Sequence, residues 1–139
     1  MPTAHIPSRQ VHLDFHTSEV IEGIGDKFSP EGFAQTLAEA HVALVTLFTR
    51  CHHGNLYYDS KRYPERVHPH LQARDMFRQQ ARACRERRIQ VHLYTTVCWD
   101  ARIAREHPEW IAVDASARQL RREPGTIFEA PGFPVALLI

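Results

Sequence analysis

Three segments of the chain have hydrophobic patterns that predict β-strands. In "VHLDFH", Val11, Leu13 and Phe15 alternate with polar residues, and this period of two is typical of a strand. The run "VALVTLF" at residues 42–48 is continuously apolar, which indicates a strand buried on both faces. We place the third predicted strand at residues 91–97, "VHLYTTV".

Amphipathic segments separate these strands and indicate helices. Ser29 suits a helix N-cap and Pro30 suits the first helical position, so the first helix is predicted to begin there and to end near His41. The segment "ARDMFRQQARACRERR" predicts a second helix packed by one face. Its apolar side chains fall on one stripe: Ala73, Met76, Phe77, Ala81 and Cys84. A last helical segment, "ARIAREHPEWIAV", is interrupted at Pro108.

The strict alternation of strands and helices predicts an α/β fold with a parallel sheet and right-handed crossovers. A doubly wound sheet and a (β/α)₈ TIM barrel both have this order of elements. The segment after the first strand, "HTSEVIEGIG", lacks the G-x-G-x-x-G pattern of a dinucleotide site and the lysine pattern of a P-loop. This absence favours the barrel.

All three predicted strands end in residues with potential site chemistry. In both architectures, reactive groups gather where the C-terminal ends of parallel strands meet the following loops. The three ends are Asp14–His16, Cys51–His53 and Cys98–Asp100. We therefore expect a functional site at this edge of the sheet.

Composition and charge limit the classes of protein to consider. A chain of 139 residues with 43% hydrophobic residues is sufficient for one globular domain. The 17 Lys and Arg residues against 16 Asp and Glu residues leave a formal charge of +1, which indicates neither a nucleic acid nor a membrane surface as partner. The three widely spaced cysteines argue for reduced thiols, and the N-terminus lacks a secretory pattern, so we expect a cytoplasmic location.

The histidine pair raises metal binding as an alternative. His52 and His53 are adjacent, so in an extended backbone they point to opposite faces and would share an ion only with a turn at Gly54. Further zinc ligands would be Cys51, His68 and His70. Their spacing matches no standard zinc pattern, so we predict neither a metal nor another cofactor. The expected state of the Cys51 thiol is buried and unreactive, not nucleophilic.

Two aspartates at the strand ends invite comparison with the paired carboxylates that hydrolyse glycosides. Asp14 and Asp100 are therefore catalytic candidates, and the alternative is that each braces its strand end through hydrogen bonds. Trp99 could stack on the apolar face of a sugar beside Asp100, or it could belong to the core. The tyrosines of "NLYYDSKRY" could line the same site or fasten the loop.

Several motifs in order resemble a known family. They are "HLDFHTS", "VTLFTRCHHGNLYYDSK", "HPHL", "VHLYTTVCWD" and "HPEW", which together cover about the first 115 residues. This arrangement resembles the N-terminal part of the hypothetical glycosyl hydrolase 6 family, which is similar to the catalytic barrels of α-L-fucosidases and to β-galactosidase-like proteins. The resemblance implies a (β/α)₈ barrel that acts on glycosides.

The resemblance also implies roles for residues at the strand ends. In fucosidase-type barrels, a His-His pair after the second strand and a Trp with an Asp after the third line the sugar pocket. The corresponding substrate-binding residues here are His16, His52, His53, Trp99 and Asp100. The fucosidase pattern has an aspartate directly after the His pair, and this chain has Gly54 there, so fucose specificity is not implied.

The chain is shorter than a barrel, which needs roughly 250 residues. We therefore expect residues 1–139 to form a partial TIM-barrel domain of about three to four β/α units, a truncated product or fragment whose catalytic nucleophile and acid belong to missing strands. Exposed strand edges then predict a possible homo-oligomer. Two alternatives remain, a non-catalytic carbohydrate-binding or assembly module and a metal-dependent barrel hydrolase, with ligands among His16, His52, His53 and His70.

Overall fold

The computed structural model describes residues 6–97, 99–113 and 115–119 and has a mixed α/β architecture. One sheet contains the strands β1 (Gln10–His12), β2 (Leu44–Arg50) and β3 (Gln90–Thr95), in the order β1-β2-β3. Both strand pairs are parallel, which confirms the predicted α/β class and strand direction. The described sheet has three strands and a (β/α)₈ barrel has eight, so the barrel remains a prediction.

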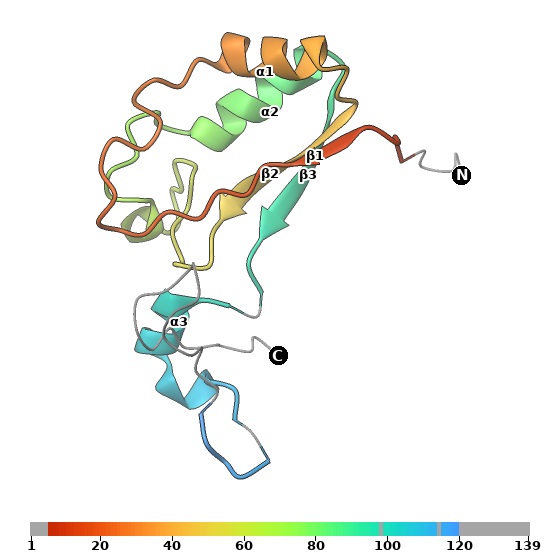
Figure 1. Cartoon of the computed structure of the whole chain (residues 1–139). Helices are drawn as coiled ribbons and strands as arrows, with labels where there is room; N and C mark the ends of the chain where they lie inside the picture. The colour runs from red at the N-terminus through yellow and green to blue at the C-terminus, as the bar shows by residue number, and fades with distance from the viewer. Residues whose placement is uncertain (1–5, 98, 114, 120–139) are drawn as a thin grey trace.

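Two helices cover one face of the sheet (Figure 1). They are α1 (Pro30–Glu39) and α2 (Met76–Glu86). The start of α1 is confirmed, because the Ser29 hydroxyl accepts a hydrogen bond from the Gly32 amide at 3.1 Å and Pro30 occupies the first turn. No helix in the described ranges has both the length and the apolar character needed to cross a membrane.

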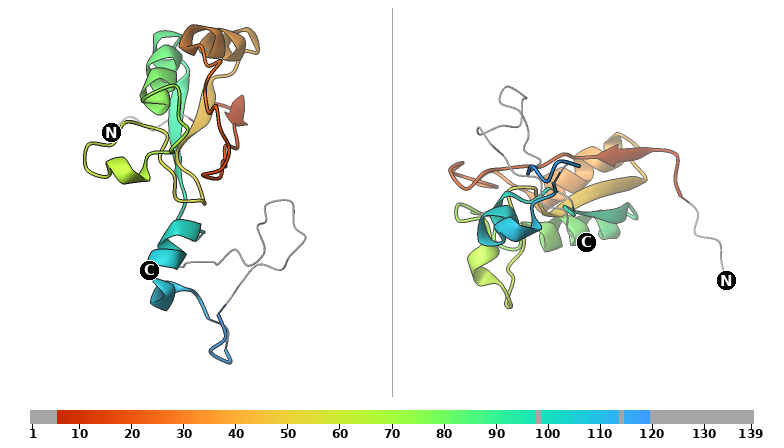
Figure 2. Two further views of the ribbon diagram at one scale, coloured as in Figure 1. Left: turned by 90° about the vertical axis from the view of Figure 1, so that its left-hand side faces the viewer. Right: turned by 90° about the horizontal axis from the view of Figure 1, so that it is seen from below.

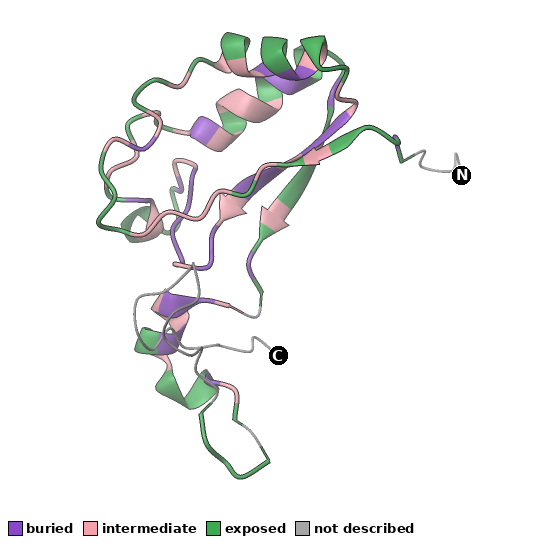
Figure 3. Ribbon diagram, viewed as in Figure 1, coloured by how far each residue is buried: buried purple, intermediate pink, exposed green. Residues whose placement is uncertain are grey.

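The main core lies between these two helices and the central strand. Its buried members are Ala34, Leu37, Val45, Leu47, Ala83, Cys84 and Ile89. Every second residue of β2 faces the helices, because side chains alternate along a strand. Cys84 fills the core as predicted, and burial raises the pKa of its thiol to about 11. Figure 3 shows buried residues along β2, in parts of both helices and in the loop that follows β2.

The segments that follow β2 and β3 lie beyond the C-terminal edge of the sheet. The loop after β2 contains a 3₁₀ helix, η1 (Pro64–Arg66), and β3 leads into α3 (Ala101–Glu106) and η2 (Pro108–Trp110). The interruption at Pro108 is confirmed. Figures 1 and 2 show α3 past the strand ends instead of on the sheet face. Leu93 in β3 consequently remains 62% exposed.

The described cysteines are unpaired thiols. Cys51 and Cys84 are both fully buried, and Cys98 lies outside the described residues. A buried thiol is shielded from reagents in solution, which agrees with the expected unreactive state of Cys51. The cytoplasmic location stays a prediction.

Candidate functional site

Side chains from all three strand ends meet in one group, which we call the histidine cluster and which consists of His16, His52, His53 and Trp99. The rings of His16 and His52 are stacked, with centroids 3.6 Å apart and planes inclined by 17°. The His52 ring is 4.8 Å from that of His53 and 6.5 Å from that of Trp99. The structure therefore brings together four of the residues that the sequence placed in a sugar site.

Hydrogen bonds on both ring nitrogens fix the orientation of His16. Its Nδ1 accepts a hydrogen bond from the His52 backbone amide at 3.2 Å, and its Nε2 lies 3.0 Å from Asp14 Oδ1. In the neutral ring, the proton is consequently on Nε2 and is donated to the Asp14 carboxylate. Burial lowers the pKa of His16, against the opposing charge of Asp14, so the neutral form is favoured.

An aromatic pair supports the histidine cluster from the strands below it. Phe48 of β2 lies opposite Tyr94 of β3 in the sheet register, and their rings stack at 4.1 Å. The His16 ring meets Phe48 edge-on, with centroids 4.8 Å apart and an angle of 89°. Sequence reasoning assigned Phe48 and Tyr94 only to strands. The signal that could have found them is their position near two strand ends that also carry site residues.

The turn after the His pair depends on a glycine. The Gly54 amide donates to the Cys51 carbonyl at 2.9 Å, and Gly54 has φ of +90°, where a side chain is strained. A Cβ at this position would lie 2.6 Å from Arg102 Cβ and 2.9 Å from Asp100 Oδ1. The aspartate of the fucosidase pattern therefore does not fit here unless α3 moves.

Asp100 has a structural role after the end of β3, where it connects β2 to α3. Its carboxylate has no exposed surface, pairs with the Arg50 guanidinium, and accepts the Ile103 amide at 2.8 Å as the N-cap of α3. The next amide, that of Ala101, donates to the His52 carbonyl at 2.8 Å. Burial raises the pKa of Asp100, while the Ile103 amide and the Arg50 charge oppose the rise.

The enclosure bears on the predicted sugar contact of Asp100, which stays a prediction. A carboxylate that binds sugar hydroxyls or cleaves a glycoside must reach the ligand, and the Asp100 oxygens are covered by the protein. The alternative expectation, a strand-end brace, is the one that the geometry supports. Asp14 differs, because 52% of its side chain is exposed while it is bonded to His16.

A second set of polar contacts holds the loop after β2 to the segment after β1. Tyr57 is fully buried, and its hydroxyl lies 2.7 Å from Thr17 Oγ1 and accepts the Thr17 amide at 3.1 Å. Asn55 Nδ2 donates to the Thr17 carbonyl at 3.1 Å. Tyr57 thus fastens the loop, whereas the sequence left open whether the tyrosines line the site.

His68 has the same structural role. It is 2% exposed, its Nε2 lies 2.9 Å from the Ser18 carbonyl oxygen, and its Nδ1 accepts the His70 amide at 3.2 Å. Burial lowers its pKa. Within the described ranges, no group of three or more His, Cys, Asp or Glu side chains is arranged to hold a metal ion, so the metal-dependent alternative gains no support from geometry.

Comparisons with known proteins identify the family. A solved structure, α-L-fucosidase isoenzyme 2 from Paenibacillus thiaminolyticus, is 35% identical in sequence and superimposes with a TM-score of 0.78. The match covers 94% of this chain and 19% of that one, so the chain spans about a fifth of the fucosidase. No curated protein gives a significant match. The profile of the hypothetical glycosyl hydrolase 6 family matches residues 29–132, and the chain belongs to this family.

Proposed function

We propose that the chain supplies the sugar-binding side of a glycoside hydrolase active site, built on three β/α units of a (β/α)₈ barrel. The observation that carries the proposal is the meeting of His16, His52 and Trp99 from three parallel strand ends. This edge is where barrel enzymes place their sites. The glycosyl hydrolase family and the similarity to a fucosidase support the same class of ligand.

The differing exposure of the site residues suggests two layers. His16 and His52 are nearly buried, with 10% of the His16 side chain and 6% of His52 exposed, so in our proposal they position the outer residues. Asp14, His53 and Trp99 retain exposed surface and form the outer layer. There the Trp99 ring would stack on a sugar face while Asp14 and His53 bind hydroxyl groups.

Hydrolysis needs two carboxyl groups at the scissile bond, one as acid and one as nucleophile or base. Asp100 is enclosed, and Asp14 is bonded to His16. Glu19, whose charge acts on His53, pairs with Arg105 at 3.4 Å, so each described carboxylate near the histidine cluster already has a partner. We therefore propose that the catalytic pair comes from strands other than β1, β2 and β3. In this proposal, the chain binds sugar without cleaving it.

Sugar binding by the purified chain tests the proposal. L-fucose, D-galactose and D-glucose would be titrated by NMR into the wild-type protein and two variants. Trp99→Ala should weaken binding of the accepted sugar by about 1–3 kcal/mol, a magnitude taken from base stacking on aromatic residues. Trp110→Ala is the matched control, because Trp110 is 45% exposed but stacks on His107, outside the histidine cluster. Equal losses in both variants would contradict the proposal.

The sheet edges support a further proposal about assembly. Within the described sheet, β1 and β3 each pair with one neighbour, so each has an open edge. Open edges offer unpaired backbone groups to another strand. We propose that two copies associate through these edges, and light scattering on the chromatographed protein should give twice the mass of 16.1 kDa. A monomeric mass at every concentration would contradict it.

A further inference from the structure

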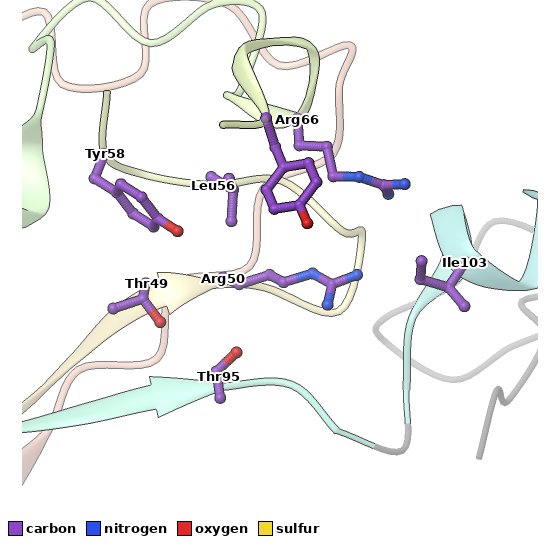
Figure 4. Close-up of a pocket in the computed structure, with 8 residues that line it drawn as sticks. Thr49, Arg50, Leu56, Tyr58, Arg66, Thr95 and Ile103 are labelled. Carbon is purple, nitrogen blue, oxygen red and sulfur yellow. The ribbon is translucent and has the colours of Figure 1, made fainter. Parts of the chain in front are cut away.

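A cavity of about 390 Å³ lies between the ends of β2 and β3, the loop after β2 and α3 (Figure 4). The residues that line it are Thr49, Arg50, Leu56, Tyr58, Tyr63, Arg66, Thr95 and Ile103. No residue of the histidine cluster is among them, so this cavity is separate from the proposed sugar site. Its volume is within the range of small-molecule sites.

Two arginines dominate the chemistry of the cavity. Their side chains are largely covered, with 19% of Arg50 and 22% of Arg66 exposed. Arg50 pairs with Asp100, and Arg66 Nη2 donates to Glu106 Oε2 at 2.5 Å. In Figure 4, the two guanidinium groups extend from opposite walls toward the side where Ile103 lies.

These ion pairs leave hydrogen-bonding capacity unused. Three buried atoms here have no hydrogen-bond partner in the described part of the chain: the donors Arg50 Nε and Arg66 Nη1 and the acceptor Asp100 Oδ2. A guanidinium carries only donors, and a buried donor without an acceptor costs about 1–3 kcal/mol. Both arginines line the cavity and keep about a fifth of their side chains exposed, so an acceptor inside it can reach the accessible part of each guanidinium group.

The other residues that line the cavity limit which acceptor groups it could bind. Tyr58, Tyr63 and Thr95 contribute hydroxyl groups, whereas the Thr49 hydroxyl is already donated to the Tyr94 carbonyl at 2.7 Å. The apolar lining residues are Leu56 and Ile103. The lining thus combines two cationic side chains, hydroxyl groups that can donate hydrogen bonds and two apolar side chains. Such a lining fits a small ligand group that carries several hydrogen-bond acceptors.

We propose that this cavity binds the oxyanion group of a small molecule, a carboxylate or sulfate. Planar guanidinium groups recognise such anions through paired, charge-assisted hydrogen bonds. Asp100 and Glu106 lie beside the same arginines and reduce their field, so we expect the anion to bind weakly. The inference does not depend on sugar binding at the histidine cluster.

NMR of the arginine Nε–H groups tests the proposal on the full chain. Sodium sulfate, D-glucuronate and D-glucose would be titrated separately at constant ionic strength. We expect saturable shifts of the Arg50 and Arg66 signals with sulfate or glucuronate, and none with glucose. Stronger binding of glucuronate would assign the site to acidic sugars, and stronger binding of sulfate would assign it to a free anion. No saturable shift, or equal shifts with glucose, would overturn the proposal.

A matched pair of variants separates the cavity from its surroundings. Arg66 and Arg102 both pair with Glu106, but only Arg66 lines the cavity. Arg66→Gln should weaken anion binding about tenfold, the loss expected for one charge-assisted hydrogen bond. Arg102→Gln should change the affinity for the anion by less than twofold. If Arg102→Gln weakens anion binding as much as Arg66→Gln, the proposed contact between Arg66 and the anion is refuted. Tyr63→Phe removes one hydroxyl while keeping both arginines, and it should weaken binding less.

Discussion

The helix-covered sheet and the segments beyond the strand ends are stabilised in different ways. Between β2, α1 and α2, a continuous group of apolar side chains is buried. Beyond the strand ends, the apolar clusters are smaller, and individual polar contacts, such as Tyr57 with Thr17 and Arg50 with Asp100, join the loops. A substitution in the first region should affect the whole core, because its side chains are close-packed, whereas a substitution in the second region should act mainly on the loop whose contact it removes.

The largest expected effect is on the second region. Asp100→Ala removes the partner of the buried Arg50 charge and the N-cap of α3, which should cost about 3–5 kcal/mol. Hydrogen exchange should show lost protection in α3 while α1 and β2 keep theirs. Asp100→Asn retains a capping oxygen without the charge and should lose less. Uniform loss of protection in both regions would show that they unfold together.

The core should respond globally to a cavity. Leu47→Ala is expected to lower the free energy of unfolding by about 2–5 kcal/mol, measured by urea denaturation. The control is Leu93→Ala, because Leu93 lies opposite Leu47 in the register but is 62% exposed. It should change stability by less than about 1 kcal/mol. Similar losses for both leucines would contradict the view that burial against the helices stabilises this region.

Gly54 provides a smaller test, confined to the turn after the His pair. Gly54→Ala should destabilise the protein by about 1–3 kcal/mol, because its positive φ and its contacts with Arg102 and Asp100 leave no room for a Cβ. Gly32→Ala is the control, since Gly32 lies inside α1. A Cβ there would lie 3.3 Å from Ser29 Oγ, the end of a short side chain, so thermal denaturation should show a smaller loss than for Gly54→Ala. A neutral Gly54→Ala would mean that the turn rearranges freely.

The smallest effect concerns pH. Burial lowers the pKa values of His16, His53 and His68 below the ordinary value of 6.5, so the unfolded chain binds more protons than the folded chain between the two values. Stability from these residues is complete above about pH 6.5 and is lost as pH falls below it. Urea denaturation between pH 7.5 and 5 should show this decline. His68→Gln should flatten it, and an unchanged slope in that variant would exclude His68 as a cause.

Local sequence signals predicted the first region well. Ser29 and Pro30 mark the start of α1 because capping involves neighbours in the chain, and the apolar run at residues 42–48 corresponds to β2 with a shift of two residues at each end. Parallel pairing followed from the order of the elements. The first strand was predicted longer than the described β1, since its last backbone hydrogen bond to β2 is from the Leu13 amide to the Thr46 carbonyl at 3.4 Å.

The polar contacts of the second region could be predicted only in part. Sequence position at strand ends brought His16, His52 and Trp99 into one hypothesis, and the structure places them together. Tyr57 and Thr17 are 40 residues apart, and no pattern in the sequence links them. Arg50, a cation at the end of an apolar run, was not recognised as the partner of Asp100. Such contacts depend on the tertiary fold and carry no periodic signal.

The close packing at Gly54 limits how this protein could be redesigned. The missing side chain allows the turn after β2 to lie against Asp100 and Arg102, which belong to the segment after β3. A designer who inserts the fucosidase aspartate at position 54 must therefore also reshape residues 100–102. The two loops form one exchangeable unit, and they should be grafted as a pair.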